Sequence, residues 1–234
     1  MKITFLYHSA FLVELESCSL LFDWTGERSL PEFDRSKPLY VFASHHHHDH
    51  YTPRIFSLGM ENVTYILASC IRLSAKRKAG LGIREEAVVR LQAGVTRQVG
   101  ELTVQTVRSN DAGVAYIVRC GETSIFHAGD LNDWYWEEEA KEWNDRIAAT
   151  FQRSLAQLQD IVVDVAFLPL DGRLGKAFSW GFHQFMQRLQ CRLAIPMHCW
   201  GDFSVIPRLK ELPESAAYRS LVADISADGQ IINF

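Results

Sequence analysis

Short apolar segments separated by turn residues fill the first 130 positions, and this density of strand signals limits the fold more than any other feature. After residue 130 the period changes, because apolar residues spaced by four and three predict a helix over 136–160. The pattern predicts an α/β (α+β) chain that is β-rich at first and alternates afterwards. The chain closes on residues 231–234, and the other helices are predicted over 53–58, 71–79, 178–190 and 204–211. Strands are predicted over 2–7, 11–16, 20–22, 39–43, 63–67, 87–91, 95–99, 102–107, 114–119, 123–127, 162–168 and 193–197.

Composition limits the class of protein. No long polar linker or repeat divides the 234 residues, so we expect a single domain over 1–234. The net charge of −4 argues against a broad electrostatic grip on nucleic acid, and no apolar run reaches the roughly 18 residues that a membrane span needs. Five cysteines without Cys-x-x-Cys spacing fit a reducing compartment. We expect a cytoplasmic protein that acts on a small molecule; the sequence leaves its oligomeric state open.

A run of histidines at 44–50, SHHHHDH, directly follows one of the predicted apolar strands. An expression tag is excluded by its internal position, and a solvated histidine-rich loop is the plain alternative. Residues two apart in an extended loop project to the same side. We therefore expect His45 and His47 to hold one metal ion, while His46 and His48 point away.

Two further ligand types follow in the same run. Asp49 and His50 lie where the chain turns toward the next helix, so they can face a second ion. Imidazole and carboxylate are good ligands for zinc and similar divalent ions. The run therefore predicts a site for one or two divalent ions.

The order of motifs resembles that of the metallo-β-lactamase-fold hydrolases, whose His-x-His-x-Asp-His signature precedes a later His, a later Asp and a final His. Segments 7–11 (YHSAF) and 20–23 (LLFD) resemble the first strands of the lactonase-like branch. Segments 126–130 (FHAGD) and 195–198 (IPMH) resemble the strands that end in the bridging aspartate and the last histidine. The resemblance implies a four-layer αββα sandwich of two mixed β-sheets flanked by helices, with a dinuclear metal site along one edge.

Carried over residue by residue, the resemblance implies a set of metal ligands. A turn cap at Asp130 and a core histidine at His198 are the structural alternatives. Zinc is the expected ion, with manganese or iron as alternatives. The implied ligands are His45 and His47 for the first ion, Asp49, His50 and His198 for the second, and Asp130 as the bridge.

The sequence departs from the family pattern in one ligand. The family places a histidine between the first motif and the bridging aspartate, but no histidine lies between His50 and His127. The corresponding segment offers Asn110 and Asp111, of which Asp111 is the better donor because its oxygen is anionic; a turn residue is the alternative. The first site is therefore expected to be the weaker one, and to favour Mn²⁺ or Fe²⁺.

Other polar and aromatic residues are candidates for supporting the ligands or binding substrate. Arg173, after a predicted strand, is a candidate clamp for a phosphate or carboxylate, with a surface arginine as the alternative. His8, Asp23 and Asp171 lie at predicted turns or strand ends. Asn132 and Trp134 lie just beyond the bridging aspartate, and core packing is the alternative role for the Trp134 ring. The candidates are His8, Asp23, Asn132, Trp134, Asp171 and Arg173.

Together these features predict a metal-dependent hydrolase in which a metal-bound hydroxide cleaves an ester, lactone or phosphodiester. Asp49 and His50 are the expected catalytic pair. Two alternatives stay open. One is a degenerate, non-catalytic member that binds a metal or ligand, which the missing histidine motivates. The other is an iron-dependent redox or thioester enzyme of the same fold.

Overall fold

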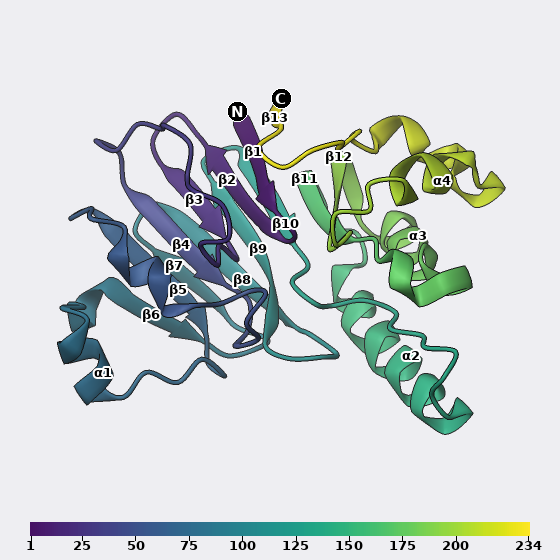
Figure 1. The fold of residues 1–234 in the computed structure, drawn as a ribbon, viewed down its shortest axis with the longest axis horizontal. Helices are drawn as coiled ribbons and strands as arrows, with labels where there is room; N and C mark the ends of the chain where they lie inside the picture. Colours follow the sequence, from purple (N-terminus) through teal and green to yellow (C-terminus); the bar gives the residue numbers. More distant parts are fainter. The chain divides into compact units, whose positions relative to one another are not determined.

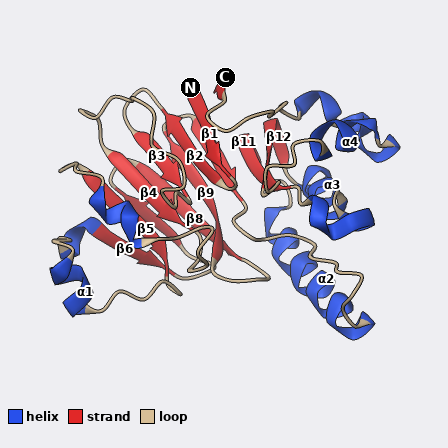
Figure 2. Cartoon of the chain, viewed as in Figure 1, coloured by secondary structure: helices blue, strands red, loops and turns tan.

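The chain divides into two compact units, each built on its own mixed β-sheet. The computed structural model describes residues 1–234, except for the side chains of Ala75, Arg77 and Lys78. Unit 1 comprises Met1–Gln92 with Ala227–Phe234, and unit 2 comprises Ala93–Ser226 (Figure 1). Figure 2 shows the strands of both sheets in red and the helices in blue. Two mixed sheets with helices confirm the α/β class expected from the sequence.

The sheet of unit 1 has seven strands in the order β13-β1-β2-β3-β4-β5-β6. Neighbours are antiparallel from β13 to β3 and parallel from β3 to β6. Because β3 and β4 are parallel, their carboxyl ends meet at one edge of this sheet. The strands are β1 (Lys2–Tyr7), β2 (Ala10–Glu14), β3 (Ser19–Phe22), β4 (Leu39–Ala43), β5 (Val63–Ala68), β6 (Val88–Leu91) and β13 (Ile231–Asn233).

The core of unit 1 explains why this edge is fixed. All five residues of β4 are buried, as are all four of β3. Phe22 stacks on Phe42 with ring centroids 4.7 Å apart, at the register where the two strands end. The backbone N–H of Asp23 then donates to the carbonyl of Phe42 at 2.9 Å. The residues that follow β3 and β4 are therefore held side by side.

The sheet of unit 2 has six strands in the order β12-β11-β10-β9-β8-β7. The neighbours β10, β11 and β12 are parallel, and the other pairs are antiparallel. The carboxyl ends of the three parallel strands therefore lie at one edge of this sheet. The strands are β7 (Thr96–Val99), β8 (Leu102–Arg108), β9 (Val114–Cys120), β10 (Thr123–His127), β11 (Val162–Pro169) and β12 (Gln190–Met197).

Helices cover part of the unit 2 sheet. Helix α3 (Trp180–Arg188) packs against β11 and β12. Its Phe185 ring lies 5.7 Å from Phe126 of β10 and 5.3 Å from Phe151 of α2. These aromatic contacts join both helices to the sheet through one buried cluster. The α-helices are α1 (Ala75–Gly80) in unit 1, and α2 (Lys141–Leu155), α3 (Trp180–Arg188) and α4 (Val205–Glu211) in unit 2.

The largest difference from the sequence-based expectation is the start of α2. A helix over 136–160 was expected, but α2 begins at Lys141. The side chain of Asn144 explains this: it accepts from the Trp136 backbone N–H at 3.0 Å and donates to the Trp136 carbonyl at 2.8 Å. A side-chain amide that satisfies these backbone groups competes with helix formation. The preceding segment stays irregular for that reason.

Several short elements also differ. The helix expected over 53–58 is a 3₁₀ helix, and that expected over 71–79 is limited to α1. Four further 3₁₀ helices were not predicted, because runs of three to six residues leave no clear periodicity, and a fifth, Ala156–Leu158, lies within the helix expected over 136–160. The 3₁₀ helices are η1 (Pro53–Ser57), η2 (Glu85–Ala87), η3 (Ala156–Leu158), η4 (Gly172–Ala177), η5 (Pro213–Ala217) and η6 (Arg219–Leu221).

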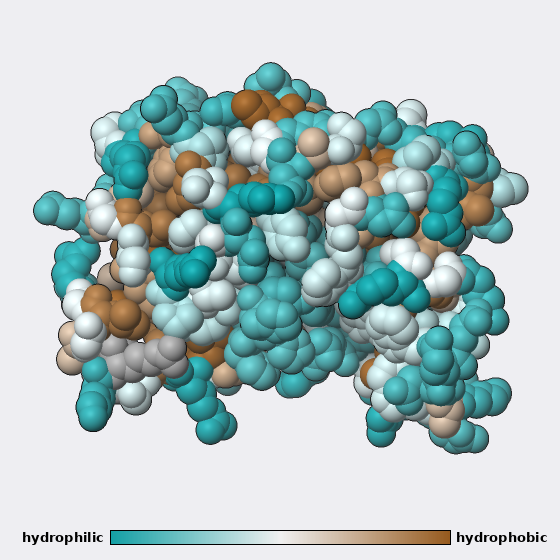
Figure 3. Space-filling model, viewed as in Figure 1, coloured by the Kyte–Doolittle hydropathy of each residue, from teal (hydrophilic) through white to brown (hydrophobic). Residues whose placement is uncertain are grey.

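The surface is mixed in character. On the face drawn in Figure 3, hydrophilic and neutral residues predominate, with smaller hydrophobic groups between them. No helix within the described part of the chain is both long and apolar enough to cross a bilayer. The large hydrophobic side chains exposed among the described residues are Val162, Trp180, Trp200, Ile231 and Phe234.

Candidate metal centre

Asp23 anchors the histidine run at one edge of the unit 1 sheet. It follows β3, and its carboxylate accepts three hydrogen bonds from the segment that follows β4. The donors are the Ser44 backbone N–H at 2.7 Å, the Ser44 hydroxyl at 2.6 Å and His50 Nδ1 at 2.7 Å. Both His50 and Asp23 are buried. A histidine that donates Nδ1–H to a carboxylate presents Nε2 as its ligand atom, so this contact fixes the tautomer and the ring orientation.

His45 and His47 form a close pair of imidazoles. His45 Nε2 lies 3.0 Å from His47 Nδ1. Two nitrogens bound to one tetrahedral zinc at ~2.0–2.1 Å would be about 3.4 Å apart, so the pair is spaced for a shared ion. His46 and His48 are exposed, whereas His45 is buried.

The backbone of the histidine run is not the extended loop expected from the sequence. The chain bends from His45 onward and turns over residues 48–50. The backbone N–H groups of His50 and Tyr51 both donate to the His47 carbonyl, at 3.1 and 2.9 Å. This turn, rather than an extended geometry, brings the last two residues of the motif back to the sheet edge.

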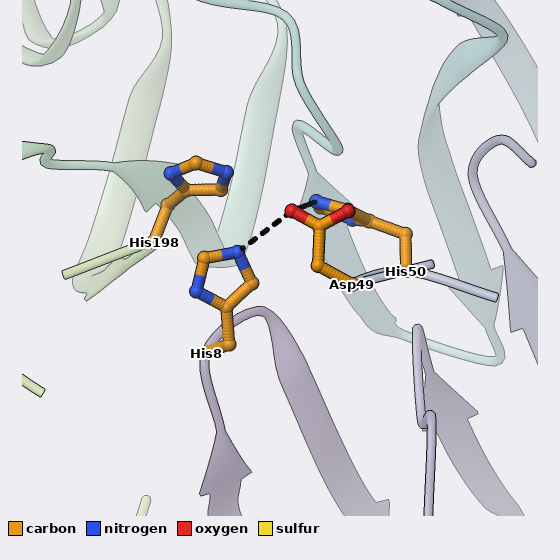
Figure 4. A group of neighbouring side chains, drawn as sticks. All are labelled: His8, Asp49, His50 and His198. Carbon is orange, nitrogen blue, oxygen red and sulfur yellow. Dashed lines mark ion pairs between the residues drawn. The ribbon is translucent and has the colours of Figure 1, made fainter. Parts of the chain in front are cut away.

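Asp49 joins two buried histidines. Its Oδ2 atom lies 3.5 Å from His8 Nε2 and 3.8 Å from His50 Nε2. Figure 4 shows these three side chains turned toward one another, with dashed lines marking the ion pairs. Their nearest ligand atoms all lie within 4.8 Å of one another. His8 therefore lies at ligand distance, although the sequence indicated only a supporting role.

His8 was hard to recognise from sequence because its position depends on a turn. It lies between β1 and β2, has φ 54°, and is 3% exposed. A bulky residue at positive φ is uncommon and marks a constrained position. Asp23, with φ 44°, has the same backbone feature. Positive φ at a polar residue directly after a strand is visible only in the structure.

Unit 2 brings Asp130 close to a histidine and to a second carboxylate. Asp130 follows β10, and its Oδ1 atom lies 3.5 Å from His198 Nε2. A carboxylate oxygen of Asp111 lies within 4.8 Å of an Asp130 oxygen. The Trp134 indole N–H donates to the Asp130 carbonyl at 2.8 Å and fixes the turn. Asp130 therefore has an imidazole nitrogen and a second carboxylate oxygen as near neighbours.

His198 is oriented from behind by Asp171. His198 follows β12, Asp171 follows the parallel strand β11, and Nδ1 of His198 lies 3.0 Å from Asp171 Oδ2. Burial acts to raise the pKa of the Asp171 carboxyl, but hydrogen bonds from His198 and Arg173 outweigh it and lower this pKa to about 2. Asp171 is therefore an anion at neutral pH, as a carboxylate that supports a ligand histidine should be.

The Asn110 side chain binds the backbone of Asn132. The Asn110 amide donates to the Asn132 carbonyl at 2.8 Å, and its oxygen accepts from the Asn132 backbone N–H at 3.1 Å. Both polar atoms of the Asn110 side chain therefore form hydrogen bonds with the loop after Asp130. Of the two substitutes considered for the missing histidine, Asp111 has a carboxylate oxygen within 4.8 Å of an Asp130 oxygen, whereas the Asn110 amide binds the Asn132 backbone.

Two indole rings border His198. The Trp134 ring centroid lies 5.2 Å from the His198 centroid, and the Trp200 centroid lies 5.7 Å from it, both edge-on. His198 and Trp200 have φ 63° and 52°. Left-handed backbone at two bulky residues so close together indicates a conformation imposed by the surrounding structure.

Comparison with known proteins agrees with these observations. The family described as "Beta-lactamase superfamily domain" matches residues 2–146. A relative from Pyrobaculum calidifontis, described as a UPF0173 metal-dependent hydrolase, is 26% identical over 230 residues, which cover 92% of this chain and 89% of the relative.

Solved structures share the fold. Igni18, described as a novel metallo hydrolase from Ignicoccus hospitalis, superposes with a TM-score of 0.66 at 15% identity, covering 100% of this chain and 97% of Igni18. CmlA, a diiron β-hydroxylase from Streptomyces venezuelae, superposes with a TM-score of 0.53 at 14% identity, covering 84% of this chain and 44% of CmlA. The resemblance to the metallo-β-lactamase fold is thus confirmed, and the chain belongs to the β-lactamase superfamily.

Proposed function

We propose that the protein is a metal-dependent hydrolase whose ligands come from the carboxyl ends of strands in both sheets. One observation carries the proposal: imidazole and carboxylate side chains gather at the end of β4 in unit 1 and at the ends of β10 and β12 in unit 2. The family resemblance, rather than the placement of the two units, implies that these side chains share one dinuclear centre. Its ligands are His45, His47, Asp49, His50, Asp130 and His198, with Asp111 completing the first site and His8 beside the second.

The residues present fit a divalent metal ion. All the donors are nitrogen or oxygen, which suits zinc, manganese or iron. Three carboxylates, Asp49, Asp111 and Asp130, supply negative charge to balance one or two dications. The 3.0 Å separation of His45 Nε2 and His47 Nδ1 suits two ligands of one ion. Buried carboxylates hold His50 and His198 on their other nitrogens, the usual support for ligand histidines.

The side chains suggest how hydrolysis proceeds. A bound divalent metal supplies a Lewis acid that polarises the scissile group and lowers the pKa of water. In this proposal Asp49 orients the proton of the attacking water, and the closeness of its Oδ2 atom to His8 and His50 supports a role beside the proposed ligands. Asp23 keeps His50 in one tautomer through the reaction. Asp171 does the same for His198, so each imidazole keeps a fixed direction.

The substrate class we propose is an ester, a lactone or a phosphodiester. All three present an electrophilic carbon or phosphorus to an attacking water. The family descriptions support hydrolysis without naming a substrate. We also propose that the protein belongs to the lactonase-like branch and that zinc is its metal ion. Iron-dependent redox chemistry is the rival, since CmlA shares the fold.

Elemental analysis of tag-free protein, combined with an activity screen, tests the proposal. We expect zinc or manganese in the protein, and turnover of at least one generic ester, lactone or phosphodiester that EDTA abolishes. Iron with a visible absorption band and no hydrolysis would favour the redox rival. Absence of turnover with every added metal would favour a non-catalytic binding protein.

A crystal structure of the metal-loaded protein tests the shared centre directly. Donor atoms bonded to a metal ion lie about 2 Å from it, so we expect the Cβ atoms of His50 and His198 within about 12 Å of each other. A larger separation would contradict a common centre while leaving separate mononuclear sites.

A further inference from the structure

Arg173 is locked in place beside the proposed metal ligand His198. Its Nε atom donates to both carboxylate oxygens of Asp171, at 2.9 and 3.1 Å, and its Nη2 atom donates to Asp171 Oδ2 at 2.5 Å. Asp171 also caps the short helix η4 by accepting from the Arg173 backbone N–H at 2.9 Å. One carboxylate thus fixes both the guanidinium and the imidazole of His198.

Two tryptophans border the guanidinium. The Arg173 Cζ atom lies 4.5 Å from the Trp200 ring centroid and 5.7 Å from that of Trp136. Such cation–π contacts orient an arginine and replace water at the faces of its plane. Trp200 also touches His198, so the guanidinium and the ligand imidazole are neighbours of the same indole.

One nitrogen of the Arg173 guanidinium is available to donate to a ligand. Its Nη1 atom has no hydrogen-bond partner among the side chains and backbone that the structure describes. The Arg173 side chain is 48% exposed, and the Trp200 residue is 40% exposed. An exposed guanidinium edge next to an exposed indole combines a fixed positive charge with a flat apolar surface. These are the two features that bind an oxyanion attached to an aromatic or other flat group.

We propose that Arg173 and Trp200 form a specificity site for a carboxylate or phosphate carried by the substrate next to a flat apolar group. This inference rests on the proposed hydrolase function, which places the scissile bond at His198. The acid group lies close to that bond, because Arg173 and His198 share both Asp171 and Trp200 as neighbours. The substrate is therefore a small acidic molecule rather than a neutral ester.

The competing explanation gives Arg173 a positioning role only. Asp171 already neutralises the guanidinium, and a locked Arg–Asp pair orients His198 whether or not a ligand binds. The two explanations differ in what they predict for ligand binding. A positioning role affects the metal ligand alone, whereas a specificity site discriminates between charged and neutral ligands.

Benzoate and benzyl alcohol separate these explanations, because they share a ring and differ in charge. Binding to the purified protein is measured by calorimetry and by quenching of tryptophan fluorescence. We expect Arg173→Gln to weaken benzoate binding about 10-fold or more, as the loss of a charge-assisted hydrogen bond does, and to leave benzyl alcohol unchanged. Arg173→Lys should recover part of the loss, because it keeps the charge but not the planar fork.

Matched controls exist in the same unit. Arg208 lies over Phe178 at the same 4.5 Å distance as Arg173 over Trp200, and Arg208→Gln should leave benzoate binding unchanged. Trp200→Leu should weaken both ligands by a few-fold, since it removes the flat surface. Trp180 is also 40% exposed, and Trp180→Leu should weaken neither.

Several outcomes would overturn the inference. Benzoate affinity that is equal in the parent protein and Arg173→Gln would leave only the positioning role. If Arg173→Gln lost the same affinity for benzoate and for benzyl alcohol, the loop would have collapsed. If Trp200→Leu and Trp180→Leu lost the same affinity, the ligands would bind non-specifically. Because none of these measurements needs turnover, the specificity site and the proposed function fail separately. Hydrolysis of neutral esters without Arg173-dependent benzoate binding contradicts only the former, and binding without any hydrolysis contradicts only the latter.

Discussion

His50 Nδ1 and Asp23 Oδ2 lie 2.7 Å apart, although 27 residues separate them in the sequence. The contact exists because β3 and β4 are parallel neighbours whose ends are in register. Burial of both side chains shields this hydrogen bond from water and makes it stronger than an exposed one. The pairing of β3 with β4 therefore fixes the orientation of the His50 imidazole.

Replacement of Asp23 by asparagine tests this relationship. Asn tolerates the positive φ of this position, so the fold is expected to persist. The charge that favours the ligating tautomer of His50 is lost, and metal affinity should fall by about 10–100-fold. Competition with a chromophoric zinc chelator measures the change. Asp34→Asn, at an exposed aspartate of the same unit, is the control, and an equal loss there would contradict a specific role for Asp23.

The histidine run offers a test of side-chain direction. His50→Ala and His198→Ala should lower the metal content and abolish hydrolysis, because both lie buried beside carboxylates. His46→Ala and His48→Ala should do neither, since both side chains are exposed. Metal analysis of the four purified variants gives the answer. Similar losses in all four would mean that the run binds metal without order.

Gly181 tests how the loop after Asp130 is supported. A Cβ atom added at Gly181 of α3 would lie 2.9 Å from the Asp133 backbone nitrogen and would overlap the Asn132 side-chain oxygen. Gly181→Ala must therefore shift the loop, and overpacking of this kind costs roughly 1–3 kcal/mol of unfolding free energy. Thermal unfolding measures it. Gly80→Ala is the control, because its added Cβ meets nothing within 4 Å; an unchanged Tm in both variants would contradict the close packing.

Sequence reasoning located the strands well because their periodicity is local. The predicted strand over 39–43 coincides with β4, and that over 123–127 with β10. The predicted start of α2 was wrong. Helical periodicity continues through residue 136, but the Asn144 side chain forms hydrogen bonds with the Trp136 backbone and the helix begins later. A hydrogen bond from a side chain eight residues away leaves no periodic signal.

The residues of the candidate site could be picked out from the sequence where they follow strands, and less readily where their position depends on turns. The histidine run and Asp130 stand directly after apolar segments, so their chemistry is visible in the sequence. The ligand distance between His8 and Asp49 depends on the β1–β2 turn, in which His8 has positive φ. The lock between Asp171, Arg173 and Trp200 joins segments 27 or more residues apart, which no local pattern predicts.

Unequal metal sites are the last prediction. The site proposed on Asp49, His50, Asp130 and His198 has its full set of ligands, whereas the site on His45 and His47 lacks the family's third histidine. We expect the protein to purify with closer to one metal ion than two, and its activity to rise when Mn²⁺ or Zn²⁺ is added.

Variants at the position of the missing histidine test the assignment. A carboxylate oxygen of Asp111 lies within 4.8 Å of an Asp130 oxygen, so Asp111→Ala should remove most of the binding at the weaker site, and Asp111→His should tighten it. Asn110→Ala should act mainly through stability, because its amide holds the Asn132 backbone. Calorimetry with Mn²⁺ resolves the two sites. Two ions of indistinguishable affinity in the parent protein, or occupancy unaffected by Asp111→Ala, would contradict the assignment, because the weaker site then has a ligand other than Asp111.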